Sequence, residues 1–121
     1  MIFRMILHEL LVTTSGAIAA IFLDYEGETV ELVCEHDLSD HDLRIIGAYQ
    51  GIFLDRLREI CTKLKLGPPL RFRVDFEGQT SILSCDVKDG YYIVLLIDNK
   101  ANEGTTWHQM DHCRDKILAE M

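Results

Sequence analysis

Two short segments of the 121-residue sequence are almost continuously apolar, and they limit the possible folds more than any other feature. Residues 17–24 read AIAAIFLD and residues 91–98 read YYIVLLID, each next to turn-forming residues. Runs of this length and composition are typical of β-strands that are buried on both faces. A sheet that contains two such strands needs a covering layer on each side, so we expect helices on both faces.

The remaining elements follow from hydrophobic periodicity and turn signals. The sequence predicts helices over 2–12, 39–66 and 105–120 and strands over 17–24, 29–36, 70–76, 80–87 and 91–98. The order α-β-β-α-β-β-β-α indicates an α+β sandwich around one five-stranded antiparallel sheet. We expect one domain over residues 1–121, because this length is near the common domain size.

The charge balance excludes several classes of partner. The chain holds 12 Lys and Arg against 20 Asp and Glu, a net charge of -8, which disfavours binding to nucleic acid or anionic membranes. Eight of the acids lie between Asp24 and Asp42, where there is no Lys or Arg. This acidic segment is either a solvated hairpin that aids solubility or a surface that steers a basic partner through Glu28, Glu31 and Glu35.

Cysteine usage and the N-terminal sequence favour a cytosolic setting. The four cysteines form no C-x-x-C pair, and we expect reduced thiols because the chain is long enough to form a core without disulfides. His8 and Glu9 interrupt the apolar N-terminal stretch, so we expect neither a secretory leader nor a membrane span.

No motif points to an active site. The sequence contains no phosphate-binding G-x-x-x-x-G-K-[ST] or G-x-G-x-x-G pattern and no G-x-S-x-G elbow. His108, His112 and Cys113 have partial metal-ligand spacing, as do His36 and His41 among nearby aspartates, but neither set is complete. We therefore expect a protein without a catalytic site, metal or cofactor.

The long helix carries apolar residues on two sides. The stripe expected to face the sheet is Leu43, Ile46, Phe53, Leu54, Leu57, Ile60, Cys61 and Leu64. The opposite side of its first half is also apolar, and Gly47 and Gly51 allow close approach of another backbone. Either another helix of the chain covers this side, or this side is a dimer or partner interface. We predict that it is an interface. The predicted interface residues are Ile45, Ala48, Tyr49, Ile52 and Arg56 of the helix with Phe72 and Val74 of a possible edge strand.

Four segments in this order resemble the Roadblock family of dynein light chains and MglB-type regulators of small GTPases. They are GAIAAIFLDYEGE, IIGAYQGIFLDRLREI, KLGPP and KDGYYIVLLID. The resemblance implies a profilin-like sandwich that forms homodimers or family heterodimers through the long helix and the third strand, with one sheet continuous across two subunits.

The resemblance also implies a function. Roadblock proteins act as scaffolds, and bacterial members bind or activate a Ras-like GTPase, so we expect a non-enzymatic homodimeric regulator of a cytosolic small GTPase. The alternative is a structural scaffold or adaptor subunit of a motor- or signalling-associated complex that leaves GTP turnover unchanged. The family offers no catalytic signature to transfer, so Arg44, Arg56 and Arg58 of the long helix are not assigned as arginine fingers.

Overall fold

The computed structural model describes residues 1–35 and 38–121, which contain three helices and five strands. In chain order these are α1 (Ile2–Thr13), β1 (Ala17–Leu23), β2 (Thr29–Cys34), α2 (Asp40–Leu64), β3 (Arg71–Asp75), β4 (Ser81–Lys88), β5 (Tyr91–Ile97) and α3 (Glu103–Ala119). The strands form one antiparallel sheet in the order β2-β1-β5-β4-β3. The element order and the antiparallel sheet confirm the fold class expected from the sequence.

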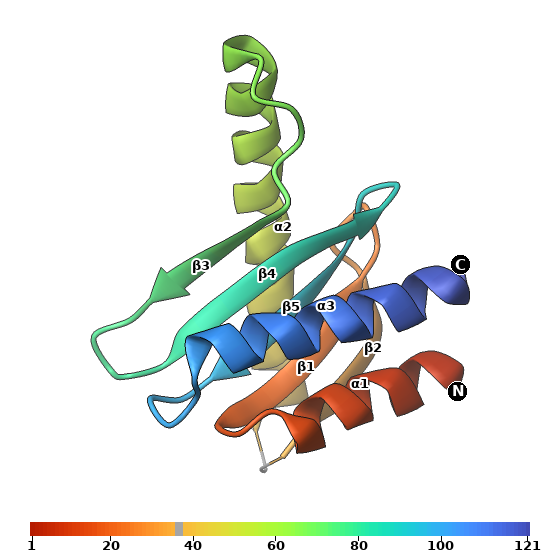
Figure 1. Ribbon diagram of the computed structural model, residues 1–121, viewed down its shortest axis with the longest axis vertical. Coiled ribbons are helices and arrows are strands. Elements are labelled where there is room, and N and C mark those ends of the chain that lie inside the picture. The colour runs from red at the N-terminus through yellow and green to blue at the C-terminus, as the bar shows by residue number, and fades with distance from the viewer. Residues whose placement is uncertain (36–37) are drawn as a thin grey trace.

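The two strands that are apolar on both faces pair with each other inside the sheet. Every residue of β5 after Tyr91 is buried, and in β1 only Ile18 is partly exposed. Figure 1 shows α1 and α3 side by side over one face of the sheet and α2 on the opposite face. Helices thus cover both faces, as the composition of β1 and β5 requires.

The two helical layers cover the sheet unequally. On one face, α1 and α3 bury residues such as Leu7, Met110 and Ile117 against the sheet. On the other face, Leu43 and Leu54 are the fully buried large apolar residues of α2. The long helix is therefore the least covered of the three described helices.

α2 begins as its sequence signals predict and ends slightly earlier than expected. The Ser39 hydroxyl accepts a hydrogen bond from the Asp42 backbone N–H at 3.2 Å, which confirms the predicted N-cap. The chain leaves the helix at Lys65, where φ is 56°, before the expected stop at Gly67. Among the described helices, none combines the length and apolar character that crossing a bilayer requires.

Two of the four cysteines lie in the core of the protein. Cys85 of β4 and Cys113 of α3 are both buried in the layer formed by α1, α3 and the sheet. Burial disfavours the thiolate and raises the pKa of each thiol to about 12.

We expect the protein to lose stability as the pH rises from about 9 to about 12. The unfolded chain releases these thiol protons near the ordinary pKa of 9.0, whereas the folded chain keeps them up to about 12. The folded state binds more protons in this range, so its stability falls by up to about 4 kcal/mol for each thiol. Urea denaturation at neutral pH and at about pH 11 measures the loss. Cys113→Ala should show a smaller loss, and an equal loss would contradict the role of this thiol.

Candidate functional site

α2 buries residues against the sheet only up to Leu54. Its buried residues are Leu43, Gly47, Gln50 and Leu54. A helix of 25 residues is about 37 Å long, whereas the eight residues of β4 span about 27 Å. The C-terminal part of α2 consequently projects beyond the sheet (Figure 1). The expectation that one stripe faces the sheet along the whole helix is wrong for Phe53, Ile60 and Leu64, which are exposed.

The contact between α2 and the sheet depends on two glycines. A Cβ at Gly47 would lie 2.8 Å from a methyl carbon of Leu23, and one at Gly51 would lie 2.4 Å from the Tyr92 hydroxyl oxygen. The Tyr92 hydroxyl donates a hydrogen bond to the Gly47 carbonyl at 2.8 Å, and burial raises the pKa of Tyr92 to about 12. The close approach permitted by these glycines is therefore to the chain's own sheet.

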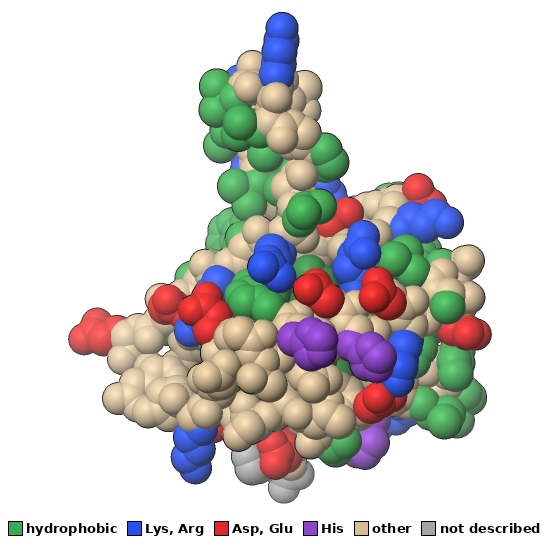
Figure 2. Space-filling view, in the orientation of Figure 1, with side chains coloured by type: hydrophobic (Ala, Val, Ile, Leu, Met, Phe, Trp, Pro, Cys, Tyr) green, Lys and Arg blue, Asp and Glu red, His purple; other side chains and the backbone are tan. Residues whose placement is uncertain are grey.

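Apolar residues spaced three or four apart continue along one flank of α2, beside the residues that contact the sheet. They are Ile46, Tyr49, Phe53, Leu57, Ile60 and Leu64, which we name the flank stripe; Ile46 and Leu57 are partly buried and the other four are exposed. At 100° per residue they fall within an arc of about 80°. Figure 2 shows apolar side chains gathered on the projecting part of the helix. Such spacing is typical of seams between packed helices, and the part beyond Phe53 has no covering element in the described chain.

The flank stripe begins beside the edge strand β3. Ile46 and Phe72 pack against the same buried cluster on the α2 face of the sheet. Val74 shares this face with Phe72 because side chains alternate along a strand, and both are half-buried. The two predicted β3 residues thus lie on the face of the sheet that α2 covers.

Among the predicted helix residues, only Tyr49 belongs to the flank stripe. At 100° per residue, Arg56, Ile45 and Ile52 lie about 20°, 40° and 60° beyond Tyr49 around the helix, and Ala48 lies about 100° beyond it. Ile52 and Tyr25 border a hollow of about 60 Å³ between α2 and the β1–β2 turn. Arg56 is exposed and forms an ion pair with Glu59 at 3.5 Å. The predicted interface residues of α2 therefore border the flank stripe on the side of the helix that faces the β1–β2 turn.

Solved structures share this fold. A Roadblock/LC7 domain from Streptomyces avermitilis matches with a TM-score of 0.87 and 13% identity, over 97% of this chain and 95% of that chain. This chain has the Roadblock/LC7 fold. The gliding protein MglB from Thermus thermophilus matches with a TM-score of 0.86 and 14% identity, over 97% of this chain and 86% of that chain. MglC from Myxococcus xanthus matches over 100% of both chains, with a TM-score of 0.68 and 23% identity.

Self-association occurs on the Roadblock/LC7 fold, since another MglB structure of this shape has a tetrameric arrangement. By sequence alone, the chain matches no protein-family model and no curated protein.

The Roadblock/LC7 fold separates the three acids that the sequence groups together. Glu28 lies in the β1–β2 turn, where its backbone N–H donates to the Asp24 carboxylate at 3.0 Å. Glu31 forms an ion pair with Arg4 of α1 at 2.9 Å, on the opposite face of the sheet from α2. Glu35 follows β2 and is exposed. That this end of the molecule steers a basic partner stays a prediction. One of the three acids, Glu31, already forms an ion pair within the chain.

The arginines and histidines singled out in the sequence form no recognisable catalytic group within the described part of the chain. Arg44 and Arg58 are ion-paired with acids of α2, and Arg58 also contacts Asp86 of β4 at 2.7 Å. His108 and His112 are exposed on α3. Within residues 1–35 and 38–121, no three His, Cys, Asp or Glu side chains are placed to hold a metal ion. His36 and Asp37 lie outside the described residues.

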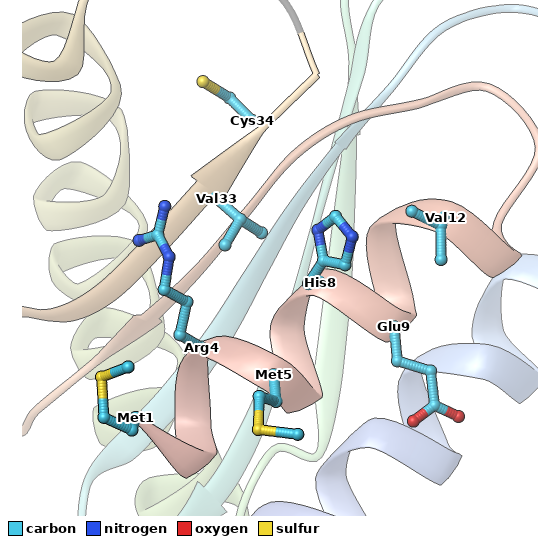
Figure 3. A pocket seen from close by; sticks show the side chains of 8 residues that line it. All are labelled: Met1, Arg4, Met5, His8, Glu9, Val12, Val33 and Cys34. Atoms are coloured by element: carbon cyan, nitrogen blue, oxygen red, sulfur yellow. The ribbon is translucent and has the colours of Figure 1, made fainter.

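A groove of about 660 Å³ lies between α1 and β2, lined by Met1, Met5 and Val12 among others. Arg4 lies beside β2 in this groove (Figure 3). Its guanidinium donates to the Leu32 carbonyl at 3.2 Å as well as to Glu31. The groove therefore contains a side chain that occupies the free edge of β2.

Sequence reasoning assigned most of the flank stripe to the sheet contact. The sequence shows the spacing of these six residues, but periodicity gives only the angles between their side chains around the helix. It does not say which of these side chains face the sheet. The length of the helix is the signal that could have corrected this assignment, because a helix about 37 Å long extends beyond the sheet that it packs against.

Proposed function

We propose that this chain is a non-enzymatic Roadblock-type module that self-associates through the flank stripe and β3 and regulates a Ras-like small GTPase in the cytosol. The observation that carries the proposal is the exposed flank stripe beside an edge strand, on a fold shared with MglB and MglC. The Roadblock resemblance of the sequence supplies the class of partner. A regulatory effect on the GTPase requires no catalytic residue of this chain.

Self-association is supported by the amount of apolar surface that α2 exposes. Tyr49, Ile60 and Leu64 are each more than half exposed, with 56%, 51% and 64% of their surface in solvent. Contiguous apolar surface of this kind is unusual on a monomer and typical of protein interfaces. A second copy would cover the projecting part of α2, and the surface around Ile52 would then be left for the GTPase.

Light scattering on the purified protein tests the first part of the proposal. We expect a particle of twice the 13.9 kDa of one chain at micromolar concentration, because the flank stripe is then buried. A monomer at this concentration would contradict self-association.

The second part is tested by single-turnover GTP hydrolysis by a Ras-like GTPase encoded beside this chain, with and without the protein. We expect faster hydrolysis that saturates with added protein. Binding without a change in rate would instead support a scaffold, and no binding would refute the choice of partner.

A further inference from the structure

The helix α1 is apolar on its outward side as well as on the side that packs on the sheet. Met5 and Val12 have 67% and 64% of their surface in solvent, whereas Leu7 and Leu10 are buried. At 100° per residue, Met5, His8 and Val12 fall within an arc of about 60° on the side of the helix opposite Leu10. A helix that is apolar on two opposite sides needs a second covering element, and none of the described elements covers this side.

The outward side of α1 borders the groove of about 660 Å³ between α1 and β2. Val33 of β2 lines this groove together with Met5, His8 and Val12 (Figure 3). The spacing of the three helix residues, three and then four apart, is that of seams between packed helices. Methionine adds a flexible, polarisable side chain that adapts to the shape of a partner.

The edge of β2 beside the groove is closed to an added strand. The Leu32 carbonyl accepts a hydrogen bond from Arg4 at 3.2 Å, and the Leu32 N–H donates to the Glu31 carboxylate at 3.2 Å. Side chains of the same molecule thus occupy the backbone groups in the middle of this edge, which is a known way to prevent strand addition. An occupant of the groove must therefore satisfy its own backbone hydrogen bonds, as a helix does.

The β2 side of the groove is acidic. β2 lies in the segment between Asp24 and Asp42, which holds eight acids and no Lys or Arg. Arg4 of α1 lies in the groove, but its ion pair with Glu31 at 2.9 Å balances its charge. A partner that lies along β2 therefore meets a negative surface, which attracts Lys and Arg side chains.

Glu35 is the acid best placed to meet such a partner. It follows Cys34, which lines the groove, and its backbone N–H donates to the Ile18 carbonyl at 2.9 Å, so the strand pairing extends to it. Val33 packs in the core layer under α1, and Glu35, two residues further on, lies on the same face of the sheet. Glu35 is exposed, and no ion pair among residues 1–35 and 38–121 includes it.

We propose that the α1–β2 groove binds a basic amphipathic helix of a partner protein. The apolar side of this helix covers Met5 and Val12, and its Lys or Arg side chains lie along β2 beside Glu35. The groove is on the opposite face of the sheet from α2 (Figure 1), so it is separate from the flank stripe and goes beyond the proposed function. A second copy of this chain is a poor occupant, because it carries the same acidic β2 and a net charge of -8.

Selection from two displayed peptide libraries tests the occupant. Peptides of the first library are about 18 residues long, with leucine alternately three and four residues apart and Ala, Lys or Glu at random elsewhere. Peptides of the second have leucine at every other position, as a strand requires. Both libraries are depleted on the double variant M5E/V12E and then selected on the wild-type protein. We expect binders from the helical library, with roughly twice as many Lys as Glu at the random positions.

Each other outcome overturns the inference. A helical library without binders that require Met5 and Val12 overturns the site, and binders with equal numbers of Lys and Glu overturn the charge of the partner. Binders from the alternating library alone overturn the helix. Dissociation of the wild-type dimer by M5E/V12E in light scattering would show that a second copy occupies the groove. A monomeric wild-type protein, in contrast, contradicts only the proposed self-association.

A synthetic peptide with a selected sequence gives the size of the apolar effect. Met5→Glu should raise the peptide Kd about tenfold or more, because the contact then buries an unpaired charge. Leu66→Glu is the matched control, since Leu66 is 69% exposed and follows α2, away from the groove. We expect it to leave the peptide Kd within about twofold of the wild-type value. Equal losses in the two variants would overturn the site.

A second pair of variants measures the charge effect. Glu35→Lys should raise the peptide Kd about fivefold, because attraction to the basic side of the peptide becomes repulsion. Glu77→Lys makes the same charge change in the β3–β4 turn, at the far edge of the sheet, and should change the Kd less than about twofold. Raising the salt concentration should weaken the wild-type complex more than the Glu35→Lys complex. Equal effects of the two lysine variants would overturn the placement of the partner beside β2.

Discussion

Phe53→Asp is expected to convert the protein into a monomer while leaving the fold intact. Phe53 is 44% exposed in the single chain, near the middle of the flank stripe, so its substitution removes little packing from the folded monomer. In a symmetric dimer the change occurs twice, and each buried aromatic side chain contributes about 1.5–3 kcal/mol. The dimer Kd should rise about a hundredfold or more, measured by analytical ultracentrifugation.

Ile52→Asp is the matched control for this prediction. Ile52 is the neighbouring residue, is 51% exposed and lies about 100° round the helix, outside the flank stripe. We expect this variant to stay dimeric, with Kd within about threefold of the wild-type value, and to lose stimulation of the GTPase. If Ile52→Asp dissociates the dimer and Phe53→Asp does not, the interface lies on the side of α2 that faces the β1–β2 turn.

For α2, the sequence predicts where the helix begins and ends better than it predicts which side faces the sheet. The N-cap at Ser39 and a helix end near Leu66 follow from local signals, and the structure agrees with both to within two residues. Which angle of the helix faces the sheet depends on tertiary packing. The sequence placed Phe53 and Leu54 together in the buried stripe, yet Leu54 is fully buried and Phe53 is exposed.

The strands were predicted more reliably because their signal is local. Residues 17–24 and 91–98 correspond to β1 and β5 to within one residue at each end, since a run that is apolar on both faces has only one stable environment. The pairing of β3 with β4 and the open edge of β3 depend on where β3 lies in the sheet.

Gly51→Ala is expected to destabilise the protein, although alanine is the better helix former. The new Cβ would lie 2.4 Å from the Tyr92 hydroxyl oxygen and 2.9 Å from the adjoining ring carbon. Tyr92 is 2% exposed and cannot move without losing its hydrogen bond to the Gly47 carbonyl. Overpacking and the lost hydrogen bond together outweigh the gain of about 1 kcal/mol in helix propensity, so we expect a net loss of about 2–3 kcal/mol in unfolding free energy.

Two further variants separate this contact from a general effect of removing glycine. A Cβ at Gly104 of α3 would meet only the Asn102 side-chain oxygen at 3.5 Å, so Gly104→Ala should be neutral or stabilise by up to about 1 kcal/mol. Tyr92→Phe removes the oxygen that the Gly51→Ala Cβ would meet, so the double variant should lose less stability than the sum of the two single variants. Additive losses in urea denaturation would show that α2 does not depend on this close contact for its position on the sheet. Because the same contact sets where the flank stripe lies relative to β3, Gly51→Ala should also weaken self-association.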